Sequence, residues 1–91
     1  MDVKQAVRTA KDYVSDLFSE EQIRNIGLEE VEFDDTSKVW LVTVGFARPW
    51  ENAGFLASAG LAEPRSYKEV RLSDADGQVL SVKDRRIAKA A

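Results

Sequence analysis

The sequence predicts an α+β domain in which an N-terminal helix packs on one face of a four-stranded antiparallel sheet. Three observations predict this fold. Apolar residues recur every three or four positions near the N-terminus, four later segments alternate apolar and polar residues, and a short turn at Asp74–Gly77 joins the last two segments. A single helix buries its apolar stripe most economically across one face of such a sheet.

The first predicted element is an amphipathic helix, because its charged residues fall mostly outside one apolar stripe. Asp2 suits the N-cap, where a carboxylate accepts a hydrogen bond from a free amide of the first turn. The capping-box pattern at 19–22 predicts a second short helical turn that ends near Gly27, so we expect a helical arm that is either kinked or in two parts. The apolar stripe consists of Val3, Ala6, Val7, Ala10, Val14, Leu17 and Phe18.

The four strands are expected at Leu28–Asp34, Val39–Ala47, Tyr67–Ser73 and Val79–Lys83. The second is the longest, and apolar residues on both of its faces predict a central strand that is covered at least in part on both sides. Asp and Gly tolerate left-handed backbone, so Asp74–Gly77 is interpreted as a hairpin turn, and its spacing does not match a calcium-binding loop. We expect the core to include Val7, Val14, Leu17, Trp40, Val42 and Val70.

The composition is that of one small soluble domain spanning 1–91, with 44% hydrophobic and 32% charged residues. The chain contains no cysteine, which excludes disulfides and thiolate zinc sites. The first residues do not resemble a secretion signal, and no apolar stretch is long enough to cross a bilayer. These features predict a cytoplasmic protein that does not associate with membranes.

The charge distribution argues against nucleic acid as a partner. The net charge is −3, whereas nucleic-acid binders obtain most of their affinity by neutralising phosphates. Basic residues concentrate near the C-terminus, and we interpret 84–91 as a solubilising basic tail.

The residue types that usually carry catalysis are missing or lack a supporting pattern. No histidine is available to activate a serine, and neither a phosphate-binding glycine motif nor a cluster of metal ligands is present. Neighbouring carboxylates such as those at 34–35 are interpreted as solvated surface groups. The sequence therefore predicts a protein that is not an enzyme and that has no catalytic residue, metal or cofactor.

The segment 48–65 is the most promising place for a binding surface. It is much longer than the roughly 2–5 residues of a hairpin loop, and prolines mark both of its ends. One interpretation is a lid over the sheet face that the helix leaves open, and the other is an exposed contact surface for a protein partner or for self-association. The candidate binding residues, all large and apolar, are Trp50, Phe55, Leu56 and Leu61.

The residues from Tyr67 to Leu80 resemble the strand-turn-strand signature of PepSY-like domains, in which a Y-x-V-x-aliphatic-polar-D-x-x-G-x-V-aliphatic hairpin follows a helix and an earlier strand pair. The resemblance covers mainly 67–83, with looser agreement over Val39–Phe46. It implies a non-catalytic regulatory or inhibitory module, associated in some relatives with peptidases. The order of a Trp-containing strand, Arg-Pro, a Tyr-containing strand, Asp-Ala-Asp-Gly and a basic tail is also similar to a small gas-vesicle accessory family.

The leading hypothesis is a small, non-catalytic binding or regulatory module whose contact surface includes 48–65. Two alternatives stay open. A small-ligand-binding domain of cystatin-like or nuclear-transport-factor-like architecture would need the helix and sheet to enclose a cavity. An immunity-type or inhibitor protein would instead mask a basic partner with an acidic face made of Glu29, Glu30, Glu32, Asp34 and Asp35.

Overall fold

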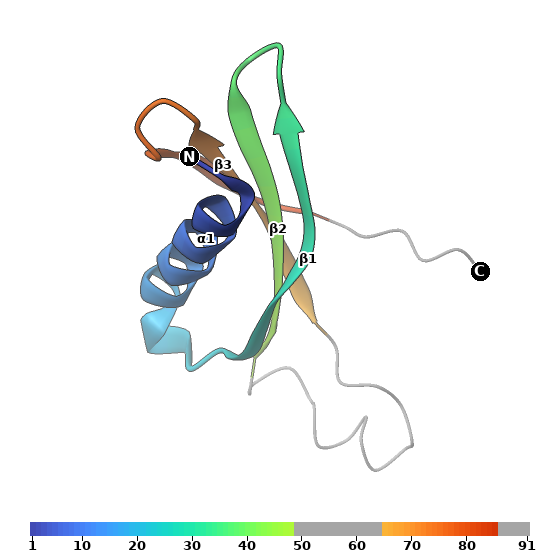
Figure 1. The fold of residues 1–91 in the computed structure, drawn as a ribbon. Helices are drawn as coiled ribbons and strands as arrows, with labels where there is room; N and C mark the ends of the chain where they lie inside the picture. Colours follow the sequence, from blue (N-terminus) through green and yellow to red (C-terminus); the bar gives the residue numbers. More distant parts are fainter. Residues whose placement is uncertain (49–64, 86–91) are drawn as a thin grey trace, which may run out of the picture.

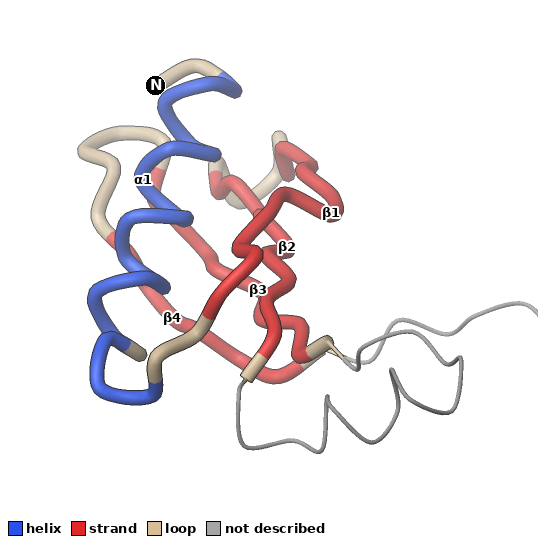
Figure 2. The backbone as a smooth tube through the Cα atoms, turned by 90° about the horizontal axis from the view of Figure 1, so that it is seen from below, coloured by secondary structure: helices blue, strands red, loops and turns tan. Residues whose placement is uncertain are grey.

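The computed structural model describes residues 1–48 and 65–85. The four strands form one antiparallel sheet in the order β1-β2-β3-β4, and the helix lies across one face of it, as Figures 1 and 2 show. The predicted α+β architecture is therefore confirmed. The elements are helix α1 (Val3–Leu17), a 3₁₀ turn η1 (Ser19–Glu21), and strands β1 (Arg24–Asp34), β2 (Val39–Ala47), β3 (Ser66–Ser73) and β4 (Val79–Asp84).

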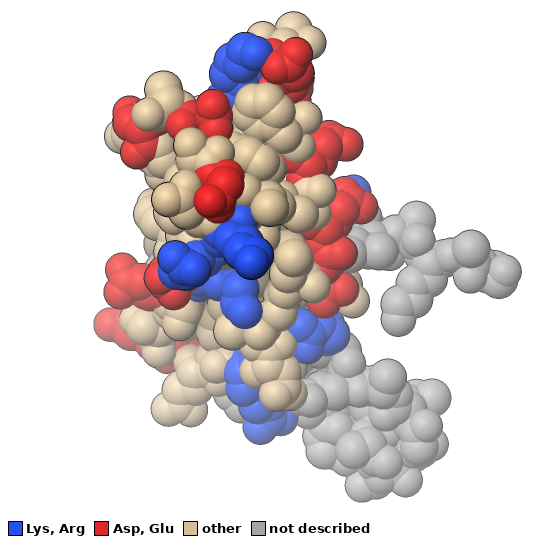
Figure 3. All heavy atoms as spheres, in the orientation of Figure 1, with Lys and Arg blue, Asp and Glu red and all other residues tan. Residues whose placement is uncertain are grey.

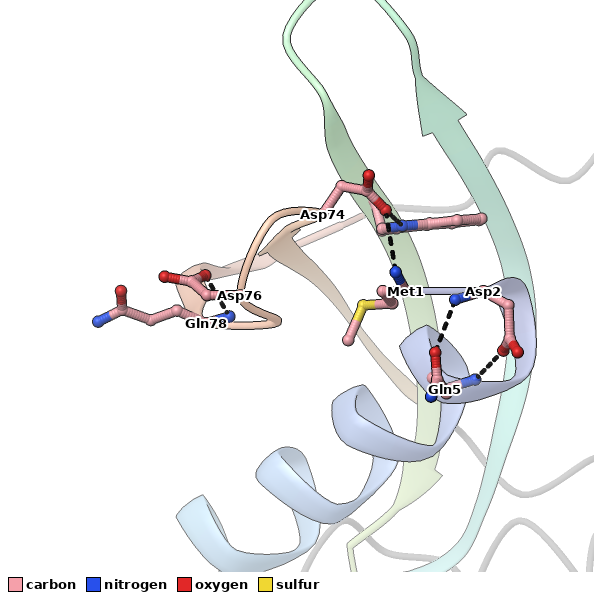
Figure 4. Close-up of polar contacts among 7 residues, drawn as sticks. Met1, Asp2, Gln5, Asp74, Asp76 and Gln78 are labelled. Atoms are coloured by element: carbon pink, nitrogen blue, oxygen red, sulfur yellow. Dashed lines mark hydrogen bonds and ion pairs between the residues drawn. The ribbon is translucent and has the colours of Figure 1, made fainter.

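Helix α1 begins at a capping box. The Gln5 amide donates to the Asp2 carboxylate at 2.8 Å, and the Gln5 side chain accepts from the Asp2 amide at 2.8 Å (Figure 4). These two bonds satisfy amides that a helix start otherwise leaves free. The second capping box, predicted at 19–22, does not form. The 3₁₀ turn follows Phe18 without a side-chain cap, and Gln22 ends it in the left-handed region with a φ of 52°.

Strand β1 begins at Arg24, earlier than the predicted Leu28. Its register with β2 shifts between Arg24 and Gly27 and again between Leu28 and Glu30. Such irregularities break the two-residue alternation that identifies a strand in a sequence, so the first part of β1 is not recognisable from its pattern. Gly27 consequently pairs with Gly45 within the sheet and does not end a helical turn.

The hydrophobic core lies between α1 and the sheet. Ala6 and Ala10 are fully buried, and their small side chains let the helix backbone come close to the strands. Burial is confirmed for three of the predicted core residues, namely Val14, Val42 and Val70. The remaining large members of the core are Val44, Phe46 and Leu72.

The other predicted core residues are not fully buried. Leu17 is 53% exposed, and its prediction is wrong because α1 packs against β1 and β2 but less against β3, which leaves one flank of the helix uncovered. Val7 is half-buried at the side of the helix. Trp40 is also half-buried: its ring packs on Phe33 with centroids 4.8 Å apart, while its Nε1 donates to the Asp74 carboxylate at 2.9 Å.

The Asp74–Gly77 segment forms the predicted hairpin turn. The Gly77 amide donates to the Ser73 carbonyl at 2.8 Å, and Gly77 has a φ of +70°, which side chains disfavour. A Cβ at this position would also lie 2.8 Å from the Met1 Cε atom. The Met1 amino group is 3.6 Å from the Asp74 carboxylate, so the start of α1 and the turn are in contact (Figure 4).

Candidate functional site

An open groove of about 490 Å³ lies between α1 and the edge strand β1. Its apolar surface comes from Val3 and Val7 of the helix and from Leu28 and Val31 of the strand. Val3 and Leu28 are each 44% exposed. Apolar surface that is concentrated in a concave site and left in contact with water is typical of a contact surface.

The rim of this groove is mostly basic. Lys4, Arg8 and Lys11 recur at helical spacing and all line the groove, with Asp12 beside them. Within residues 1–48 and 65–85, none of these three cations forms an ion pair. Figure 3 shows basic side chains gathered in the middle of this face, with acidic side chains on either side. The groove therefore combines an apolar floor with cations that are available to a partner.

A bulge in β1 creates the strand side of the groove. Leu28 pairs with Val44 and Val31 pairs with Val42, and both partners lie in the core. The extra residue between Leu28 and Glu30 is what brings two residues three positions apart onto the same face of the strand. Regular alternation would have turned one of them to the opposite face.

The sheet face opposite α1 carries a polar network that crosses the sheet. Arg85, which follows β4, donates from Nη1 to the Glu30 carboxylate on β1 at 2.7 Å and to the Thr43 hydroxyl on β2 at 2.5 Å. Thr43 is only 1% exposed, so this contact satisfies a buried hydroxyl. The hydrogen bond to Glu30 raises the pKa of Arg85 above its ordinary value. The network links the two edges of the sheet.

A second polar cluster on this face depends on a glycine. The Arg65 Nη2 atom lies 3.5 Å from the Glu29 carboxylate and donates to the Asn25 carbonyl at 2.9 Å. A Cβ on Gly45 would lie 2.9 Å from the Glu29 carboxylate and 3.0 Å from the Arg65 guanidinium. The missing side chain thus makes room for the ion pair near the C-terminal end of β2.

Most of the predicted acidic face is engaged within the chain. Besides the two glutamates paired with Arg65 and Arg85, Asp35 forms an ion pair with Lys38 at 2.5 Å. Asp34 closes the β1–β2 turn. Hydrogen bonds from the Ser37 hydroxyl, and from the amides of Ser37 and Thr36, lower the pKa of the Asp34 carboxyl. These contacts occupy most carboxylates of the acidic strand, so few of them are available to a basic partner. The cations of the groove are more available to an acidic partner.

The predicted binding residues lie outside the described part of the chain, and so do residues 86–91 of the predicted basic tail. The two ends of the 48–65 connection are described. Arg48 lies over the rings of Phe18 and Phe46, at 5.5 and 5.3 Å from their centroids, and Arg65 belongs to the cluster at Gly45. The four predicted binding residues that lie outside the described part are Trp50, Phe55, Leu56 and Leu61.

Sequence reasoning missed the groove. Val3 and Val7 belong to the apolar stripe that the sequence predicts to face the sheet, and Leu28 is only the first residue of a predicted strand. The available signal was the row formed by Lys4, Arg8 and Lys11 directly beside the apolar stripe. That row indicates a basic flank on the helix but does not say which strand lies next to it.

Comparisons of the chain with protein-family models, curated proteins and solved structures gave no match. Among residues 1–48 and 65–85, no helix is long and apolar enough to cross a membrane. The same ranges contain no group of three or more potential metal-ligating side chains.

Proposed function

We propose that the protein is a small non-catalytic binding module that docks a protein partner in the groove between α1 and β1. The observation that carries the proposal is the half-exposed apolar floor bordered by three cations that form no ion pair with the described residues 1–48 and 65–85. A partner that covers this floor gains about 25 cal/mol for each Å² of apolar surface removed from water. The cations favour a partner whose contact surface is apolar and acidic.

The packing of the helix supports a contact surface more than an enclosed ligand site. Ala6, Ala10 and Val14 fill the space directly between α1 and the sheet. The groove lies beside this packed layer, along the flank of the helix. An open groove of this kind suits a partner that approaches from the side of the domain.

The proposal extends to the role and location of the module. The resemblance of 67–83 to PepSY-like domains implies a regulatory module, which agrees with binding without catalysis. We assign it to the cytoplasm, which a chain without cysteine suits. The 48–65 connection remains a second proposed part of the contact surface.

The test compares a groove variant with a charge reversal outside the groove. The groove variant is Lys4→Glu with Arg8→Glu, two exposed positions where Glu has similar helix propensity to the residue it replaces. The control is Lys38→Glu, which reverses an exposed charge in the β1–β2 turn. Each 91-residue chain is immobilised and used to capture proteins from a lysate, and circular dichroism and thermal melting verify the fold.

We expect the wild type and the Lys38→Glu control to retain the same proteins, and the folded groove variant to lose them. A folded groove variant that captures every protein the wild type captures would show that the groove is not the contact surface.

A further inference from the structure

The flank of α1 opposite the groove also exposes apolar side chains. Ala10 is fully buried and marks the direction of the sheet. At about 100° per residue, Val7 and Tyr13 lie about 60° to either side of that direction, because one precedes Ala10 by three positions and the other follows it by three. Val7 lines the groove beside β1. Tyr13 therefore faces the other way, toward the β3 and β4 side of the sheet.

This opposite flank is chemically complementary to the groove. Tyr13 is 43% exposed and Leu17 is 53% exposed. Asp16 lies on the same flank, is exposed, and forms no ion pair within residues 1–48 and 65–85. We call Tyr13, Asp16 and Leu17 the acidic flank. It offers apolar groups and an available carboxylate where the groove offers an apolar floor and available cations.

The sheet layer shows the same complementarity with the signs exchanged. Glu30 pairs with Thr43, Thr43 with Glu69, and Glu69 with Lys83, so these side chains share the face opposite α1 from one edge of the sheet to the other. The β1 edge of this face is acidic and carries the exposed Glu32, whereas Lys83 is exposed on the β4 edge. A β4 edge set beside a β1 edge of another copy would bring opposite charges together in this layer too.

We propose that the partner in the groove is a second copy of this chain, whose acidic flank docks onto the groove of its neighbour. This inference rests on the proposed function and names its partner. The interface is heterologous, since each copy uses its groove for one neighbour and its acidic flank for another. Because the two surfaces lie on opposite sides of α1, both can be occupied at once, and the copies associate head to tail in open-ended chains.

The contact is made by side chains and needs no hydrogen bonding between sheets. The ladders of both edge strands are irregular, between Leu28 and Glu30 in β1 and at Leu80 in β4. Bulges of this kind hinder the regular pairing of one sheet edge with another. We therefore expect association that depends on protein concentration and weakens as salt screens the exposed charges.

Two complementary variants test the head-to-tail arrangement. The groove variant, Lys4→Glu with Arg8→Glu, keeps its acidic flank. The flank variant, Asp16→Asn with Leu17→Ser, keeps its groove and gains no charge that could attract the altered groove. All four positions are exposed, so both variants are expected to fold, which circular dichroism and thermal melting verify.

Sedimentation velocity then measures the mass of each protein over a range of concentrations. We expect the average mass of the wild type to rise with concentration, and each variant alone to stay at the monomer mass of 10.2 kDa. An equal mixture of the two variants should reach twice that mass and stop growing. In such a pair the intact acidic flank of the groove variant docks onto the intact groove of the flank variant. The two altered surfaces cannot bind a further copy.

Three outcomes would overturn the inference: a wild type that stays monomeric, a wild type that stops at the dimer, or a variant mixture that stays monomeric. Failure of this inference is distinguishable from failure of the proposed function. If the wild type is monomeric and the groove variant loses the capture of another protein, the proposed function stands and self-association is refuted. A groove variant with unchanged capture and unchanged self-association refutes both.

Discussion

Replacing Val14 with Asp is expected to destabilise the domain strongly or to unfold it. Val14 is fully buried on the sheet-facing side of α1, in one cluster with Val42, Phe46 and Leu72. The substitution removes the burial of a valine side chain, which stabilises the folded state by about 1.5–3 kcal/mol. It also buries a polar group without a hydrogen-bond partner, which costs a further roughly 1–3 kcal/mol even when the carboxyl is neutral.

The combined loss is large compared with the stability of so small a domain. The two costs sum to about 2.5–6 kcal/mol. A domain of this length is stable by about 5–14 kcal/mol, at roughly 0.05–0.15 kcal/mol per residue. Each kcal/mol lowers the melting temperature by about 4–8 °C, so we expect Val14→Asp to melt at least about 10 °C lower or to be unfolded from the start. Burial raises the pKa of the new carboxyl, so the loss should be greater above that pKa, where the group must ionise.

Thermal melting followed by circular dichroism measures this effect, and Leu17→Asp is the matched control. It introduces the same carboxyl into the same helix at a position that is 53% exposed, where we expect a loss of about 1 kcal/mol or less. A cooperative melt of Val14→Asp near the wild-type temperature would refute the packing of α1 on the sheet. An equally large loss in Leu17→Asp would refute the exposure of the acidic flank.

Three further outcomes are expected. Gly77→Val should cost on the order of 1 kcal/mol or more in urea unfolding, because Gly77 has a φ of +70°, and an unchanged midpoint would contradict the strain argument. Hydrogen bonds lower the pKa of Asp34 from 3.8, so its contribution to stability is complete above 3.8 and is lost as the pH falls through the lowered value. Ser37→Ala should raise the titration midpoint of Asp34 measured by NMR, and an unmoved midpoint would show that the Ser37 hydroxyl does not hold this carboxylate. Trp50→Ala with Phe55→Ala should leave the domain folded with a modest loss of stability but abolish partner capture or self-association; global unfolding, or retention of every interaction, would indicate a lid or a spacer.

The order and type of the elements follow from local patterns in the sequence. The capping box at Asp2 and Gln5 and the left-handed glycine at Gly77 act over a few residues, so the printed sequence is enough to place the helix start and the last turn. The alternation from Val39 to Ala47 likewise predicts the central strand with its observed bounds. These features depend on neighbours in the chain and need no knowledge of distant contacts.

Tertiary structure alone decided which of these residues are available for binding. Val3, Val7 and Leu17 share the apolar stripe with Val14, but only the position of α1 over β1 and β2 determines that Val14 is covered while the others border open flanks. The strand side of the groove depends on a bulge, and a bulge is defined by the pairing partner on β2. The polar network from Arg85 to Thr43 and β1 also joins residues far apart in the chain. A sequence pattern specifies which face of an element is apolar, whereas exposure depends on where the neighbouring elements end.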